Sequence, residues 1–244
     1  MWQGRTVSVV ASTFRDRHTI RDVVDDLFAT DVVDEVLIVD NNAEEGTRTA
    51  LDGSGARIVH EPRQGLGFGF HTALCSASGD LVITLEVDGT YVARDILKLL
   101  VYSDDFDVVC GTRTSRLLIR DGAQMGAVTR WSNVLYAKAV ELVFNGPHLS
   151  DVGCIFRLMS RRAIDQVRTV PLDGGWAYNL DLLIHLLRSH TSLIEVPVNF
   201  QERVGAAVGA GQSFGTAASI AVRMLGIIAR HLVRSNRRSP NVNP

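Results

Sequence analysis

Hydrophobic residues in the first 110 positions alternate between two spacings. Short β-branched runs recur, and the segments between them carry apolar residues three or four positions apart, as at Ile20, Val24 and Leu27. Strands that alternate with helices predict a mainly parallel sheet covered by helices on both faces, so we expect an α/β fold. The predicted strands are 6–11, 35–40, 57–60, 81–85 and 107–110.

The alternation is less regular after Gly111. Helical spacing predicts helices over 131–144, 161–167, 176–187 and 214–235, with Ser160 as the cap of the second. Strands are predicted over 152–158 and 193–200, and a flexible glycine-rich loop over 205–215. We divide the chain into a domain of residues 1–211 and a helix with a tail, residues 212–244.

Composition narrows the class of protein. With 244 residues, 46% of them hydrophobic and 21% charged, the chain is not expected to be disordered, collagen-like or a coiled coil. The three cysteines lack the spacing of a disulfide framework or a zinc site and suggest a reducing cytoplasmic compartment. No apolar run reaches the ~18 residues of a spanning helix, and we expect no signal peptide.

Charge is distributed unevenly along the chain. The formal net charge of -2 argues against nucleic-acid binding. The last acidic residue is Glu202, and six arginines follow without a carboxylate. At 100° per residue, Arg223, Arg230, Arg234 and Arg237 fall within ~60° of one helix face, and the other faces are apolar. This pattern predicts a basic amphipathic helix on an anionic membrane surface. The alternative is a helix packed on the domain or on a second copy, which leaves a homo-oligomer open.

Two carboxylates follow the most apolar predicted strand. Glu86 and Asp88 come directly after 81–85, where a turn can bring both near one point. Ligands of parallel sheets bind at the carboxyl ends of strands. Mg²⁺ and Mn²⁺ prefer oxygen ligands and usually take one or two carboxylates plus substrate phosphates. The alternative is a pair of solvated loop acids.

Two further strand ends carry candidate binding groups. Gly65, Gly67 and Gly69 would let the backbone approach a phosphate, with Arg63 adding positive charge. The alternative is a flexible loop that enters a helix. Asp40 would accept hydrogen bonds from a base or ribose, or else form a turn.

Six segments in order resemble the motifs of family 2 glycosyltransferases with the GT-A fold, and in particular the polyprenyl-phosphate glycosyltransferases related to dolichyl-phosphate mannose synthase. Glu86-Val87-Asp88 is similar to the metal motif Asp-x-Asp, and Arg63-Gln64-Gly65 to the turn Arg-x-Gly. The resemblance covers about residues 6–210. The matching segments are 7–16, 36–42, 63–67, 86–91, 151–157 and 195–203.

The resemblance implies metal-dependent, inverting transfer of a sugar from a GDP- or UDP-sugar. Asp88 would bind Mg²⁺ or Mn²⁺, and Glu86 would assist. A divalent cation would offset the charge that grows on the leaving diphosphate. The residues that would surround the nucleotide-sugar are Thr13, Arg15, Asp16, Asp40, Arg63 and Glu86.

The acceptor is left with two alternatives. A polyprenyl phosphate needs cations, which Arg130, Arg157 and Arg203 would supply, and it would place the protein on the inner face of the membrane. A hydroxyl acceptor needs a general base, for which Asp181 matches the family position. A third reading is a non-catalytic nucleotide-sugar-binding subunit.

The chain departs from the family pattern at three places. Glu86 replaces the usual aspartate, which favours the non-catalytic reading. Ser12 stands where proline usually precedes the threonine, and Arg15 replaces asparagine. After Arg203 the usual Ser-Lys is absent, which removes one phosphate-binding lysine.

Overall fold

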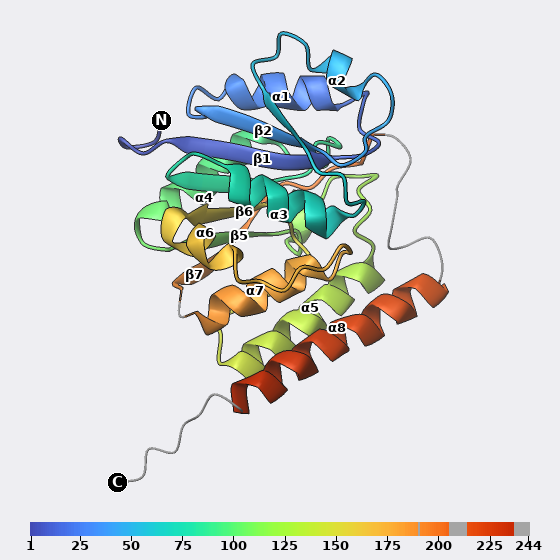
Figure 1. The fold of residues 1–244 in the computed structure, drawn as a ribbon. Coiled ribbons are helices and arrows are strands. Elements are labelled where there is room, and N and C mark those ends of the chain that lie inside the picture. Colours follow the sequence, from blue (N-terminus) through green and yellow to red (C-terminus); the bar gives the residue numbers. More distant parts are fainter. Residues whose placement is uncertain (190, 205–213, 237–244) are drawn as a thin grey trace.

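The computed structural model describes residues 1–189, 191–204 and 214–236. Its core is a seven-stranded sheet in the order β3-β2-β1-β4-β6-β5-β7 (Figure 1). All neighbouring strands are parallel except β6, which runs antiparallel to β4 and β5. The predicted α/β fold is therefore confirmed. The strands are β1 (Val7–Thr13), β2 (Glu35–Asp40), β3 (Arg57–His60), β4 (Leu81–Thr84), β5 (Val108–Thr112), β6 (Arg157–Ser160) and β7 (Leu193–Pro197).

Helices cover both faces of this sheet. α1 and α4 pack on one face, where Ile20 and Leu99 join the sheet side chains in one apolar cluster. α3, α6 and α7 pack on the other face, and α5 and α8 extend that second layer (Figure 1). The α-helices are α1 (Ile20–Phe28), α2 (Thr47–Ala50), α3 (Leu66–Ser76), α4 (Ile96–Val101), α5 (Ala127–Phe144), α6 (Arg161–Val167), α7 (Tyr178–Arg188) and α8 (Phe214–Asn236). Short 3₁₀ turns lie at Ala93–Asp95, Tyr102–Asp104 and Arg116–Leu118.

The predicted strand over 152–158 is wrong for most of its length, since β6 begins at Arg157. Side chains satisfy the backbone before that point. Asp151 Oδ1 accepts from Gly153 N at 3.0 Å, and Asn179 Nδ2 donates to Val152 O at 3.1 Å. The prediction that Ser160 caps α6 is confirmed, because its side chain accepts from Ala163 N.

The C-terminal helix α8 packs on the domain. Met224, Ile227, Ile228 and His231 are buried at helical spacing against α5 and α7. The packing that the sequence left as an alternative is thus present. None of the helices in the described part of the chain is long and apolar enough to cross a membrane. Arg237 lies outside the described residues, as do residues 205–213 of the loop predicted over 205–215, whose last two residues belong to α8.

Candidate active site

A cleft of about 350 Å³ opens at the carboxyl ends of β1, β2 and β4. This is the edge where a parallel sheet presents ligand-binding loops. The residues lining it come from the turns after these strands, from the start of α3 and from the segments before α7 and α8. They are Ser12, Thr13, Phe14, Arg15, Asp16, Asn41, Gln64, Leu66, Glu86, Val87, Asp88, Trp176 and Arg203.

Asp88 is held in a fixed orientation within this cleft. Its Oδ1 accepts hydrogen bonds from Thr90 N at 3.0 Å and Thr90 Oγ1 at 2.6 Å. Its other oxygen, Oδ2, contacts the guanidinium of Arg203. Glu86 lies beside it, and burial together with the charge of Asp88 raises the pKa of Glu86 to about 7. Two neighbouring carboxylates that are partly removed from water repel each other, and a nearby cation stabilises their ionised forms.

In this structure the positive charge beside these carboxylates is that of Arg203. Its guanidinium contacts Asp16 Oδ1 and Asp88 Oδ2, each at 3.0 Å. Burial raises the pKa of Asp16 despite this neighbour. The sequence-based prediction put Arg203 at the acceptor, whereas here it pairs with residues predicted for the donor side.

The donor set of the cleft suits a hard divalent cation. A guanidinium already bridges Asp16 and Asp88, so their oxygens converge on a position suited to positive charge. Within the described residues no group of three or more His, Cys, Asp or Glu side chains is arranged to hold a metal. An ion bound here would therefore take one or two carboxylates and complete its shell with phosphate or water oxygens, as Mg²⁺ commonly does.

The other predicted donor residues divide into two groups. Thr13, Arg15 and Asp16 line the cleft. Asp40 and Arg63 do not. Asp40 accepts from Ala43 N at 2.8 Å and pairs with Arg48, so it forms the turn that the sequence left as an alternative. Arg63 pairs with Glu61 at 2.7 Å and stacks over Phe68.

The glycine turn serves packing. An added Cβ on Gly65, where φ is +148°, would lie 2.2 Å from Gly174 O, and one on Gly67 would lie 1.9 Å from Asp173 O. The N–H groups of Gly65, Gly67 and Gly69 already donate, to Asn41 Oδ1, Gly174 O and Gly65 O. The turn is therefore closed against the 173–175 loop, and the amides of these three glycines are not available for the predicted phosphate cradle.

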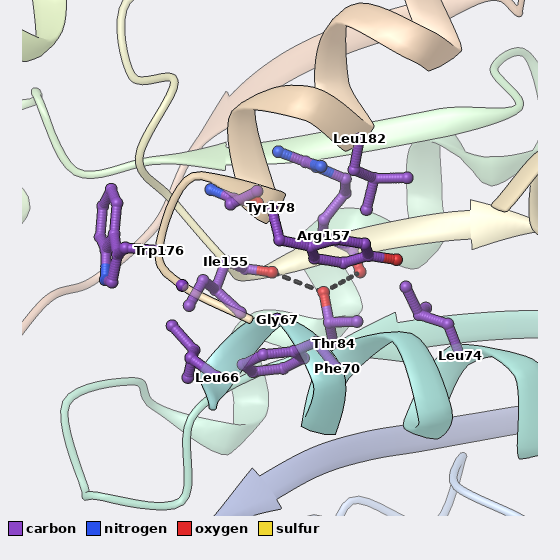
Figure 2. Close-up of a pocket in the computed structure, with 12 residues that line it drawn as sticks. Leu66, Gly67, Phe70, Leu74, Thr84, Ile155, Arg157, Trp176, Tyr178 and Leu182 are labelled. Carbon is purple, nitrogen blue, oxygen red and sulfur yellow. Dashed lines mark hydrogen bonds between the residues drawn. The ribbon is translucent and has the colours of Figure 1, made fainter. Parts of the chain in front are cut away.

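A second, much smaller pocket, of about 20 Å³, adjoins the cleft, since Leu66 and Trp176 line both. Figure 2 shows its mostly apolar walls, with Phe70 and Leu74 on α3 and Leu182 on α7. Arg157 lines this pocket at 1% exposure. Its Nε has no hydrogen-bond partner among the described residues, and its Nη2 lies 3.5 Å from Cys154 O.

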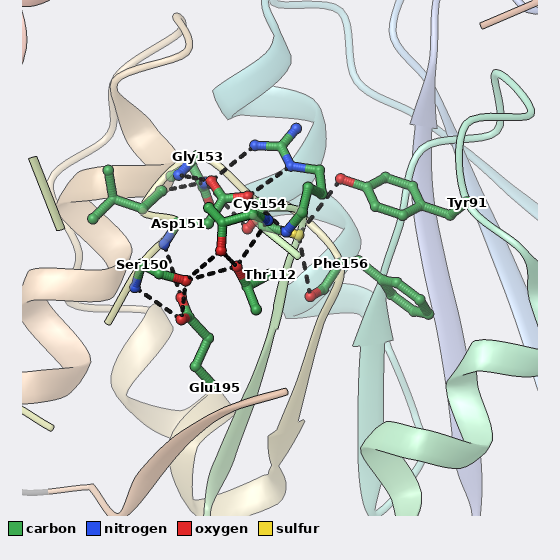
Figure 3. A network of polar contacts seen from close by, with 12 residues as sticks. Tyr91, Thr112, Ser150, Asp151, Gly153, Cys154, Phe156 and Glu195 are labelled. Carbon is green, nitrogen blue, oxygen red and sulfur yellow. Dashed lines mark hydrogen bonds and ion pairs between the residues drawn. The ribbon is translucent and has the colours of Figure 1, made fainter. Parts of the chain in front are cut away.

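A buried polar network fixes the loop that leads to Arg157 (Figure 3). Arg113 donates to both oxygens of Asp151, at 2.8 and 3.0 Å, and Asp151 N in turn donates to Glu195 Oε1 at 2.9 Å. Burial raises the pKa of Glu195 despite three hydrogen bonds from Ser150 and Asp151. This cluster holds the 150–156 segment in place behind the second pocket.

Asp181 lies outside both pockets. Its side chain is 0% exposed and is hydrogen-bonded to His231 on α8. A general base must reach the acceptor hydroxyl, so this arrangement does not support the predicted role. Arg130, in the first turn of α5, is half-buried and lines neither pocket.

Sequence reasoning did not select several residues that line the cleft, among them Asn41, Gln64 and Trp176. Asn41 had a usable signal, because it directly follows a strand end, and its amide donates to Arg63 O at 2.7 Å. Trp176 follows two glycines in a loop, and its place becomes clear only once that loop meets the glycine turn.

Comparison with known proteins gives a consistent picture. The family model described as Glycosyl transferase family 2 matches residues 8–168. The chain is similar to "Dolichyl-phosphate hexose transferase" of Haloferax volcanii, with 26% identity over 82% of this chain and 84% of the relative. It is also similar to "Undecaprenyl-phosphate mannosyltransferase" of Micrococcus luteus, with 25% identity over 69% and 72% of the two chains.

Among solved structures, the fold is similar to that of glucosyl-3-phosphoglycerate synthase from Mycobacterium tuberculosis in complex with Mn²⁺, UDP and glucosyl-3-phosphoglycerate. The TM-score is 0.69 at 19% identity, and the match covers 98% of this chain and 82% of the other. At this identity the likeness establishes the fold.

Proposed function

The chain belongs to glycosyl transferase family 2 and has a GT-A-like fold, and on this premise we propose that it moves a sugar, with inversion, from a GDP- or UDP-sugar to a polyprenyl phosphate. The observation that carries the donor half is the pair Asp16 and Asp88, which share one cation position at the carboxyl edge of the sheet, with Glu86 close enough for the charge of Asp88 to raise its pKa. The proposed cofactor is Mg²⁺ or Mn²⁺, held by Asp88 with help from Glu86.

The donor half follows from charge. The leaving group is a nucleoside diphosphate, and a divalent cation bound at Asp88 would offset the charge that develops on it. Thr13, Arg15 and Asp16 line the adjoining wall of the cleft, where the nucleoside would lie. Asp16 and Glu86 are each displaced toward the neutral form by burial, so an added cation would favour their ionised forms.

The second pocket supports an acceptor that is both anionic and apolar. Arg157 supplies a positive charge at a wall that also includes apolar and aromatic side chains, among them Leu66, Phe70 and Ile155. A phosphate anion is already a nucleophile and needs no general base, which agrees with the burial of Asp181. The two relatives compared above carry names that specify dolichyl and undecaprenyl phosphates as acceptors.

Exposed apolar side chains on the protein surface support binding to a membrane, and we propose that the protein binds its inner face. α5 and α8 lie side by side (Figure 1). Both helices expose large apolar side chains. Trp131 is 66% exposed and Leu142 is 85% exposed. The basic side chains Arg223 and Arg230 of α8 do not belong to this surface, because Arg223 pairs with Asp173 at 2.6 Å and Arg230 lies 3.8 Å from Asp181. We call the following residues the outer apolar face: Trp131, Leu135, Leu142, Val222, Leu225, Leu232 and Val233.

A hydroxyl acceptor is the second candidate. The observation that favours it is the bound glucosyl-3-phosphoglycerate in the solved structure of similar fold. This alternative requires a base other than Asp181 in its present position.

The deciding experiment is a donor and acceptor panel. GDP-mannose, UDP-glucose and UDP-N-acetylglucosamine are each incubated with Mg²⁺ or Mn²⁺ and polyprenyl phosphate in vesicles, or with 3-phosphoglycerate. Products are identified by mass spectrometry, and Asp88→Asn serves as the catalytic control. A sugar-phosphate-lipid from one donor supports the proposal. Transfer only to phosphoglycerate supports the second candidate, and equal turnover by Asp88→Asn would exclude the metal assignment.

A further inference from the structure

Arg203 occupies a position that the proposed metal also requires. Its guanidinium lies between one oxygen of Asp16 and one of Asp88, and both distances are 3.0 Å. The second oxygen of each carboxylate is already bonded within its own turn, to Thr90 in one case and to Thr13 Oγ1 and Phe14 N in the other. The two oxygens that face the cleft therefore share one cation.

Hydrogen bonds of the flanking residues Gln201 and Val204 hold Arg203 there. Gln201 N donates to Thr90 O at 3.0 Å, Gln201 Nε2 donates to Gly89 O at 2.8 Å, and Val204 N donates to Asp88 O at 3.1 Å. These bonds align residues 201–204 with the 88–90 turn. The guanidinium itself is less well satisfied, because its buried Nε has no partner among the described residues. A buried N–H group without an acceptor destabilises the folded state. The guanidinium of Arg203 would therefore gain stability in a position where its Nε also has an acceptor.

A divalent cation and this guanidinium exclude each other at Asp88. A metal that takes Asp88 Oδ2 as a ligand needs the same lone pairs that Arg203 Nη1 contacts, and the two positive charges repel. Arginine does not escape this conflict by losing its proton. From this geometry, and resting on the metal site of the proposed function, we infer that Arg203 is a built-in counter-cation that must leave Asp88 when the divalent cation binds.

The exchange predicts how metal and nucleotide help one another. The metal alone has to displace Arg203 without giving it a new partner. With a nucleoside diphosphate present, the released guanidinium gains phosphate oxygens to pair with. Metal and nucleotide should therefore bind synergistically, and the coupling is reciprocal because it is a difference in binding free energy.

The test is Mn²⁺ binding without turnover, measured from the EPR signal of the free ion. Wild type is compared with Arg203→Gln, with and without UDP or GDP. We expect Arg203→Gln to bind Mn²⁺ alone about tenfold more tightly than wild type, as expected for removal of a competing ion pair. We also expect the nucleotide to raise Mn²⁺ affinity less in the variant. Arg21→Gln, which removes an arginine paired with Asp25 on the surface of α1, is the matched control.

The outcomes separate this inference from the function on which it rests. If Arg203→Gln binds Mn²⁺ no more tightly than wild type while Asp88→Asn abolishes binding, the proposed exchange is wrong. The proposed metal site is then still supported. If wild type binds no Mn²⁺ even with nucleotide, or if Asp88→Asn binds it normally, both fail together. Should Arg203→Gln not fold, Arg203→Lys is used, and its single ammonium is expected to give an intermediate affinity.

Discussion

Asp181 on α7 and His231 on α8 form a hydrogen bond of 2.9 Å between side chains that are 0% and 4% exposed. Arg230 approaches the same carboxylate only to 3.8 Å, and Asp181 Oδ2 has no hydrogen-bond partner among the described residues. The contact closes the interface between the two helices, beside Met224 and Ile227. A residue that the family resemblance suggested for catalysis thus anchors the C-terminal helix.

Replacing His231 with alanine should loosen α8. The change leaves the Asp181 carboxylate buried without its closest partner, which costs about 3 kcal/mol in comparable sites. We expect the free energy of unfolding to fall by about this amount and the amides of α8 to exchange faster with solvent. Arg230→Gln, which removes a longer and more exposed contact, is the control and should change stability by less than about 0.5 kcal/mol. If the amides of α8 exchange at the same rate in His231→Ala as in wild type, the anchoring role is contradicted.

The sequence predicted which strand ends form the cleft, but it did not predict the side-chain contacts between residues far apart in the chain. Glu86 and Asp88 were predictable because they end a buried apolar run, so their position at the sheet edge follows from local pattern alone. The role of Asp181 depends on His231, 50 residues further along the chain, and the pairing of Arg203 with Asp16 spans 187 residues. Contacts of this kind arise from how helices and loops meet, and no spacing within one segment encodes them.

The pH dependence of stability should contain a contribution from Glu35. Burial alone would raise its pKa, but hydrogen bonds from Ser8, Ser78 and Arg57 outweigh burial and lower the pKa to about 2 from the ordinary 4.5. The stabilisation is therefore full above pH 4.5 and is lost as the pH falls through about 2. At neutral pH it amounts to roughly 2 kcal/mol after allowance for the screening of this partly exposed group by solvent.

Glu35→Gln tests this contribution by denaturant titration at several pH values. We expect the variant to be less stable than wild type by roughly 2 kcal/mol at pH 7, with the difference shrinking toward pH 2. Glu45→Gln, at an exposed position, is the control and should follow wild type throughout. A difference of the same size at pH 7 and pH 2 would show that lost packing, and not ionisation, is responsible.

The outer apolar face should matter for membranes and not for folding. Trp131→Ser and Leu142→Ser change exposed side chains, so the free energy of unfolding should stay within about 0.5 kcal/mol. Each side chain buried in a lipid surface contributes about 1.5–3 kcal/mol, so each change should weaken vesicle binding about tenfold or more. The measurement is co-sedimentation with anionic vesicles.

Val101→Ser is the matched control for that experiment. Val101 is 58% exposed on α4, on the opposite side of the sheet. It should leave vesicle binding unchanged. Equal losses from all three variants would mean that binding follows overall hydrophobicity and has no defined face, and no loss from Trp131→Ser or Leu142→Ser would exclude this surface.

Gly67 should be intolerant of even one methyl group. An added Cβ would lie 1.9 Å from Asp173 O and 2.7 Å from Tyr178 Cβ, so the 173–175 loop would have to move. That loop precedes Trp176, which lines both pockets. We expect Gly67→Ala to lower the free energy of unfolding by about 2 kcal/mol, in the range of overpacked cores, and to weaken nucleotide binding measured by calorimetry. Gly226→Ala is the control, because nothing lies within 4 Å of that position on α8 and alanine favours helix by about 0.5–1 kcal/mol. Wild-type stability with lost nucleotide binding in Gly67→Ala would instead support the predicted phosphate cradle, since the glycine would then serve the ligand and not the packing.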